Sequence, residues 1–183
     1  MRTEIMKREL AAFVMLITTL IIGERQLTAD EPTASSWQKW QPLIGIWKAE
    51  GKRSPGQGQG TFSFAYDLQN RVIVRKSHTD YPAAQGRSAF AHDDLLIIYA
   101  DESSHRFRGD YFDNEGHVIR YTAEFSPDGK TLTFTSDPAP SQPAFRLTYT
   151  MPDATALHIK FEIAPPNAPQ DFKVYVEGSA QKS

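Results

Sequence analysis

The chain contains no cysteine among its 183 residues. This absence excludes disulfides, thiolate metal sites and cysteine nucleophiles. It also excludes a lipid-anchored export signal, because that anchor is attached to a cysteine directly after the cleavage point. The folded state must therefore be stabilised by a hydrophobic core and by backbone pairing alone.

The chain also lacks a strong charge of either sign. Its 20 basic and 22 acidic residues leave a net charge of −2, and no stretch forms a basic face. This composition argues against nucleic acid as a partner. The hydrophobic fraction of 40% is enough to bury the core of one domain, and the 12 prolines and 11 glycines are typical of a fold with many tight turns.

Long hydrophobic runs are scarce. The run Leu10–Gly23 follows three basic residues and has fourteen positions, which is short of the roughly 20 that a membrane span needs. It is typical of a signal peptide, and we predict one over residues 1–29 with cleavage after Ala29. The expected location is secreted or periplasmic, with no stable membrane span after the signal is removed; an uncleaved N-terminal anchor is the alternative.

Residues 30–42 are predicted to be a lead-in followed by a short helix. Ser35 or Ser36 is placed to cap a helix that carries Trp37 and Trp40 on one side and ends near Pro42. We expect the two tryptophans to close one end of the domain as part of its core. The alternative is that they line a ligand site.

From residue 43 onward, hydrophobic residues alternate with polar ones. In Thr61–Leu68, for example, Phe62, Phe64 and Tyr66 fall on one face, which is the pattern of a half-buried strand. Tight turns are expected at Gln69-Asn70 and at two glycine-containing connections. The pattern predicts ten strands: 43–50, 61–68, 71–81, 94–100, 106–112, 117–125, 131–136, 144–151, 156–163 and 172–179.

The predicted fold class is therefore all-β. We expect residues 43–180 to form a single antiparallel up-and-down β-barrel of about ten strands with a short N-terminal helix. Closing the sheet removes the exposed edges on which strands aggregate. A sandwich of two sheets is the alternative architecture, because periodicity alone does not separate the two.

The segment Leu43–Gly51 resembles the first barrel strand of the calycin (lipocalin-like) superfamily, whose members often begin with Gly-x-Trp after a short helix. Here the motif is Gly45-x-Trp47, and Ala49 stands where the distantly similar nitrobindin-like barrels have a second glycine. The end of the chain, residues 161–166 and 172–178, resembles uncharacterised exported bacterial members. The resemblance implies a barrel and leaves its ligand open, because one fold carries many functions.

A barrel of this strand number can leave room inside for a small ligand. We therefore predict that the protein binds a small hydrophobic or amphipathic molecule without a cofactor, a metal or a catalytic residue, in an oligomeric state that the sequence leaves open. The cavity candidates are Trp47, Phe64, Tyr66, Tyr121, Phe134 and Tyr149. One inward-turned arginine could hold a carboxylate, as in fatty-acid-binding relatives, but polar neighbours favour an outward orientation for all four strand arginines, Arg75, Arg108, Arg120 and Arg146.

Two alternative functions remain. The first is a hydrolase or isomerase that uses a His/Asp pair such as His78–Asp80, since residues i and i+2 lie on one side of a strand. The second is a nitrobindin-like haem barrel, which needs a histidine that faces the cavity. The nearest histidine to the C-terminus, His158, shares a face with Lys160 and Glu162, so we expect it to face solvent.

Overall fold

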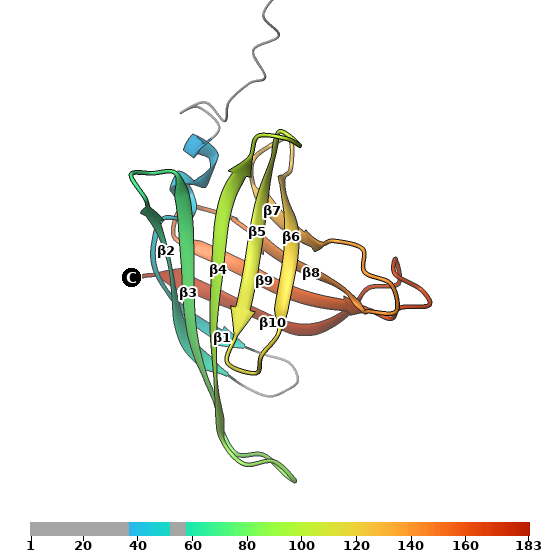
Figure 1. Ribbon diagram of the computed structural model, residues 1–183. Coiled ribbons are helices and arrows are strands. Elements are labelled where there is room, and N and C mark those ends of the chain that lie inside the picture. The colour runs from blue at the N-terminus through green and yellow to red at the C-terminus, as the bar shows by residue number, and fades with distance from the viewer. Residues whose placement is uncertain (1–36, 52–57) are drawn as a thin grey trace, which may run out of the picture.

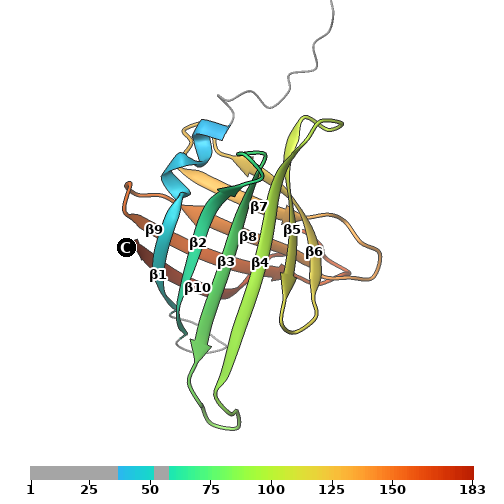
Figure 2. The same cartoon turned by 60° about the vertical axis from the view of Figure 1, so that its left-hand side comes forward.

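Ten antiparallel strands close into one barrel in the computed structural model, which describes residues 37–51 and 58–183 (Figures 1 and 2). Each strand pairs with its neighbours in sequence, and β1 also pairs with β10. The up-and-down barrel is therefore confirmed, and the two-sheet sandwich is wrong. The strands are β1 Gly45–Gly51, β2 Gln59–Asp67, β3 Val72–Tyr81, β4 Phe90–Asp101, β5 Arg106–Asp113, β6 Val118–Phe125, β7 Thr131–Ser136, β8 Ala144–Thr150, β9 Ala156–Ala164 and β10 Lys173–Lys182.

The strands agree with the predicted ranges apart from their ends, and β4 differs most. It begins at Phe90, four residues before the predicted start at Asp94. The polar residues His92 and Asp93 hid this extension, because they look like a loop in the sequence. In the structure β3 and β4 continue together past the barrel wall (Figure 1), and the rings of Tyr81 and Phe90 stack with their centroids 4.7 Å apart.

The turn predicted at Gln69-Asn70 and the two predicted glycine-containing turns, at Gly116 and Gly129, all contain residues with positive φ. Leu68, Gln69 and Asn70 all have positive φ, and the amide of Arg71 donates to the carbonyl of Asp67 at 3.1 Å to close this turn. A left-handed conformation at three successive non-glycine residues is unusual, and it reverses the chain within very few residues.

A 3₁₀ helix, η1 (Gln38–Leu43), covers one end of the barrel. Pro42 lies inside this helix. A proline has no amide hydrogen to donate, and a helix of one or two turns has few backbone hydrogen bonds for it to interrupt. Trp40 is fully buried and packs edge-on against Phe107 and Phe125, so it closes this end of the barrel as expected. The predicted caps Ser35 and Ser36 lie outside the described residues, as do the predicted signal peptide 1–29 and residues 52–57.

The pairing of β1 with β10 depends on the Gly-x-Trp segment. Gly45 has φ +132°, and a side chain there would meet Lys182, whose Cε would lie 2.9 Å from an added Cβ. The Lys182 ammonium donates to the carbonyl of Pro42 at 2.9 Å and lies 5.1 Å from the ring centroid of Trp47. The indole nitrogen of Trp47 in turn donates to the carbonyl of Leu43 at 2.8 Å. These contacts connect the first strand, the last strand and η1.

The interior is divided into two halves along the barrel axis. In the half next to η1, called the η1 half, Ile73, Leu132 and Phe134 are fully buried, and the half-buried Phe107 and Phe125 pack against them under η1. Toward the other end, called the open half, the inward residues keep part of their accessible surface: Ile119, Phe145, Ile159, Phe161 and Val176. Two other inward positions there carry only the small side chains of Ala49 and Ser77. The inward side chains of the open half are thus less completely covered than those at the centre of the core.

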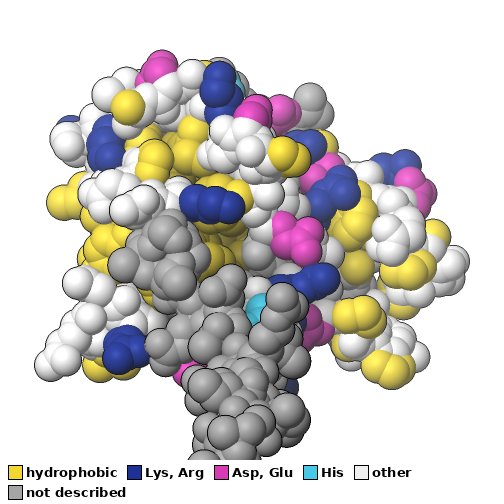
Figure 3. Space-filling view, turned by 90° about the horizontal axis from the view of Figure 1, so that it is seen from above, with side chains coloured by type: hydrophobic (Ala, Val, Ile, Leu, Met, Phe, Trp, Pro, Cys, Tyr) yellow, Lys and Arg dark blue, Asp and Glu magenta, His cyan; other side chains and the backbone are white. Residues whose placement is uncertain are grey.

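Figure 3 views the molecule from the η1 end. Hydrophobic side chains lie among acidic, basic and uncharged polar ones on this face. Of the helices in the described part of the chain, none has the length and apolar character to cross a membrane.

Core packing in the η1 half predicts a large effect for one truncation. Phe134→Ala removes a fully buried ring and should lower the free energy of unfolding by about 3–5 kcal/mol. Phe112, 38% exposed on the outer surface, provides the control. Phe112→Ala should change that free energy by less than about 1 kcal/mol. Urea denaturation measures both, and equal losses would contradict a core that lies inside the barrel.

Candidate functional site

A buried ion pair lies between the two halves of the interior. Arg75 on β3 is 7% exposed, and its guanidinium contacts the carboxylate of Asp94 on β4. The expectation that the strand arginines all face outward is therefore wrong for Arg75. Arg75 is two residues from Ile73 on β3, and Ile73 is fully buried, so both side chains lie on the inner face. The polar residues around Arg75 led to the wrong prediction.

The Arg75–Asp94 pair keeps its charges inside the barrel. Burial disfavours a charged guanidinium, but the negative charge of Asp94 opposes this effect, and the pKa of Arg75 stays above its ordinary value. The guanidinium carbon also lies 5.2 Å from the ring centroid of Phe62. The pair therefore adds two opposite charges and no net charge to the interior.

Two buried polar atoms lie beside this pair, and a side-chain hydrogen bond between Arg75 and Tyr149 lowers the pKa of the Tyr149 phenol. They are the hydroxyl of Tyr149 and the Nε of Arg75, and both are buried. Burial raises the pKa of the Tyr149 phenol to about 12, against the lowering effect of the positive charge of Arg75.

Polar side chains continue from the ion pair toward the rim of the open half. His92 lies 3.8 Å from Asp94, between its Nε2 and the carboxylate Oδ2, and the same nitrogen is 3.1 Å from the hydroxyl of Tyr111. The other ring nitrogen of His92 is 3.0 Å from Glu115 in the β5–β6 turn. The side chains from Arg75 to Glu115 thus form a continuous polar path along one wall of the barrel.

Five of the six predicted cavity residues face inward and are at most 1% exposed: Trp47, Phe64, Tyr121, Phe134 and Tyr149. Their rings contact one another; the centroids of Phe64 and Tyr149 are 5.6 Å apart, and those of Tyr121 and Phe134 are 6.1 Å apart. The sixth, Tyr66, is half-buried and donates its hydroxyl to the carbonyl of Trp37 at 3.1 Å. Most of this set packs together as an aromatic core, and its role in ligand binding stays a prediction.

The half-buried inward residues of the open half are not among the six predicted cavity residues. Alternation along β8 and β9 places Phe145, Ile159 and Phe161 on the inner face. The sequence holds no signal for how much of each side chain other residues cover, because this depends on residues from distant strands.

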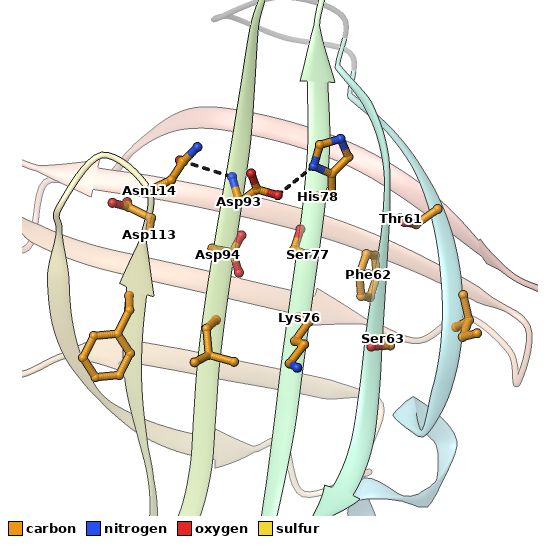
Figure 4. A pocket seen from close by; sticks show the side chains of 13 residues that line it. Thr61, Phe62, Ser63, Lys76, Ser77, His78, Asp93, Asp94, Asp113 and Asn114 are labelled. Carbon is orange, nitrogen blue, oxygen red and sulfur yellow. Dashed lines mark hydrogen bonds and ion pairs between the residues drawn. The ribbon is translucent and has the colours of Figure 1, made fainter.

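A groove of about 680 Å³ lies on the outer surface of β1–β5 (Figure 4). His78 is at its edge, with Nδ1 2.7 Å from Asp93 and Nε2 3.4 Å from Asp80. The predicted His78–Asp80 pair therefore exists, but the closer carboxylate comes from the neighbouring strand. Asn114 helps to hold the backbone at Asp93, because its side-chain oxygen accepts a hydrogen bond from the amide of Asp93 at 3.2 Å. Outward side chains from neighbouring strands line most of the groove, and the inward residues Phe62, Ser77 and Asp94 also contribute to its lining.

The remaining candidates lie on the outer face. His158 on β9 is exposed, as its pattern predicted, and does not face the interior. Arg108 pairs with Asp137, and Arg146 pairs with Glu162 at 2.8 Å. Within residues 37–51 and 58–183, no cluster of three or more His, Asp or Glu side chains is arranged to hold a metal ion.

No family model and no curated protein matches the sequence. Solved structures do resemble the fold. Rv2717c from M. tuberculosis has a TM-score of 0.59 and 14% identity, over 82% of this chain and 98% of that chain. The S-type phycobiliprotein lyase CPES from Guillardia theta has a TM-score of 0.47 and 11% identity, over 81% and 92% of the two chains. EF1p2_mFAP2b, solved with DFHBI bound, has a TM-score of 0.38 and 14% identity, over 78% and 95%.

These likenesses bear on the fold alone. The closed ten-stranded barrel fits a calycin-like fold, the class that the Gly45-x-Trp47 segment implied. The CPES and EF1p2_mFAP2b matches have TM-scores below one half, so neither bears on the ligand of this chain.

The His78 contacts predict a raised pKa. The hydrogen bond to Asp93 raises the pKa of His78 most, and the charge of Asp80 adds to it. Imidazole NMR titration should therefore give a value above the ordinary one of about 6.5. Asp93→Asn should lower it more than Asp80→Asn does. The contribution of protonated His78 to the free energy of unfolding should be complete below about pH 6.5, the ordinary pKa. It should be lost as the pH rises through the raised pKa of His78 in the folded protein. A larger effect of Asp80→Asn would contradict this geometry.

Proposed function

We propose that this protein is an exported calycin-like barrel that binds a small hydrophobic or amphipathic molecule in its open half. One observation supports the proposal: at the end of the barrel away from η1, the inward apolar side chains of Ile119, Phe145 and Phe161 keep part of their surface accessible. A folded protein gains stability by filling such space with its own side chains. An apolar wall left accessible inside a barrel supports a site for a ligand.

The chemistry of the open half favours an apolar ligand with one polar end. Its wall carries Phe145, Ile159 and Phe161, and covering apolar surface is worth about 25 cal/mol per Å². The Arg75–Asp94 pair and the Tyr149 hydroxyl are buried inside the barrel, on the η1 side of these residues. A ligand that enters from the open end meets aromatic and aliphatic side chains first and polar groups last.

Filling the open half should abolish binding. Ile119→Trp adds a large side chain on the inner face of β6, where Ile119 is half-buried. The matched control is Val118→Trp, because Val118 is the adjacent residue and is 65% exposed on the outer face. We expect Ile119→Trp to weaken binding of the neutral probe N-phenyl-1-naphthylamine at least tenfold and Val118→Trp to leave it within twofold, measured by fluorescence titration. Equal binding by both variants would contradict a site inside the barrel.

Export is proposed on the basis of residues 1–29. The full chain expressed in a bacterium should lose its first 29 residues, and the mature protein should begin at Asp30 and appear in the periplasm or medium. Intact-mass measurement of fractionated cells checks this. Replacing Leu16 by Arg in the apolar run should retain the full-length chain in the cytoplasm. Recovery of unprocessed wild-type chain in the membrane fraction would support the uncleaved anchor.

A further inference from the structure

We infer that a second copy of this chain docks on the outer face of β1–β6, and that the protein forms a two-fold symmetric dimer through this face. The inference goes beyond the proposed function and does not depend on it, because the face lies outside the barrel. Three observations support it: an apolar row that crosses six strands, a strand that is apolar on both sides, and two opposite charges without partners.

The strand register sets the apolar row. Direct pairing places six outward residues side by side, one from each strand: Ile46, Ser63, Lys76, Leu95, Phe112 and Val118. Four of the six are apolar, and Ile46, Phe112 and Val118 are exposed at 57%, 38% and 65%. Neighbouring strands lie about 4.8 Å apart, so the row is about 24 Å long. A contiguous exposed apolar patch of this kind is typical of a protein interaction site.

Strand β4 is apolar on both sides. Leu96 and Ile98 point inward and are fully buried, whereas Leu95 and Ile97 point outward and are only half-buried. Val74 on β3 continues the outer apolar surface beside Ile97. A continuous apolar run is typical of a strand that is covered on both of its faces. The barrel core covers the inner face, and the outer face of β4 has the composition of a surface that a second protein covers.

The charges of this face favour a second copy as the partner. Lys76 on β3 and Asp110 on β5 lie on opposite sides of β4. Within residues 37–51 and 58–183, neither side chain forms an ion pair or a hydrogen bond, and Asp110 forms none even with Arg120, its neighbour on β6. A face with one unpaired positive charge and one unpaired negative charge is complementary to itself.

Two-fold symmetry uses this complementarity twice. In a two-fold dimer the same surface is buried on both subunits, so a contact of residue i with residue j is matched by one of j with i. When the axis lies in the interface and crosses β4 between Leu95 and Ile97, Lys76 of each copy can lie opposite Asp110 of the other. The apolar residues of the two copies then meet between the two ion pairs.

The groove on this face provides the depth for such a contact. Ile46, Leu95 and Phe112 line its apolar part, and Lys76 lies on its middle strand (Figure 4). Side chains of a second copy can enter this volume of about 680 Å³. A stable interface buries about 800 Å² on each partner, roughly a disc 30 Å across, and the row of about 24 Å spans most of that width.

Sedimentation velocity of the wild-type protein tests the inference. At about 50 µM the protein should sediment with twice the monomer mass, as expected for a dimer Kd in the micromolar range or below. A protein that remains monomeric at this concentration overturns the inference, including the case in which the outer face binds a small molecule or a different protein.

Charge reversal tests the contact between Lys76 and Asp110. Lys76→Glu should raise the dimer Kd at least tenfold, because it places two carboxylates opposite each other at two symmetric positions. Asp110→Lys should do the same, and the double variant should return the Kd to within about threefold of the wild-type value. Lys130→Glu is the matched control, because Lys130 is exposed in the turn before β7 and should leave the Kd unchanged. Loss in both single variants without recovery in the double variant overturns the two-fold contact.

Ile97→Gln separates the apolar contact from folding. This change should raise the dimer Kd at least tenfold and leave the far-ultraviolet circular dichroism unchanged, because Ile97 lies outside the core. Val174→Gln is its control, since Val174 is exposed on β10, outside the six strands of the face. Equal effects of the two variants on the Kd overturn the inference. Should Ile97→Gln fail to fold, the wild-type mass and the charge reversal decide.

Discussion

The pairing of β1 with β10 is the contact on which the rest of the structure depends. An open sheet of ten strands would leave two edges with unpaired amides and carbonyls, and it would have two equivalent faces. Closure removes the edges and makes one face the inside. The ladder from Trp47–Lys182 to Gly51–Gly178 sets this closure, and the contacts of Lys182 with Pro42 and Trp47 connect it to η1.

Once the sheet is closed, side-chain volume decides how the interior is used. Tryptophan, phenylalanine and tyrosine side chains meet in the η1 half and exclude water there. In the open half, the small side chains of Ala49 and Ser77 occupy inward positions. The molecule thus has its stabilising core and its accessible wall in one continuous barrel, and the core holds the strands that border the wall in place.

The buried Arg75–Asp94 pair marks the boundary between these regions. Removing two charges from water is costly, and an apolar pair of similar volume is often at least as stable. The Arg75–Asp94 pair therefore does not by itself explain the stability of the folded protein. It places two opposite charges inside an otherwise apolar core, where Asp94 keeps Arg75 charged.

The sequence alone determined the strands, the turns and the inner face, because alternation has a period of two and turn residues have distinct backbone preferences. Gly45-x-Trp47 and the Thr61–Leu68 alternation illustrate this. The tertiary structure decided which inward residues are covered, and that Arg75 meets Asp94 and His78 meets Asp93. These outcomes depend on the register between strands and on how completely side chains from distant strands fill a shared volume. Neither quantity is encoded in the local pattern of any one strand.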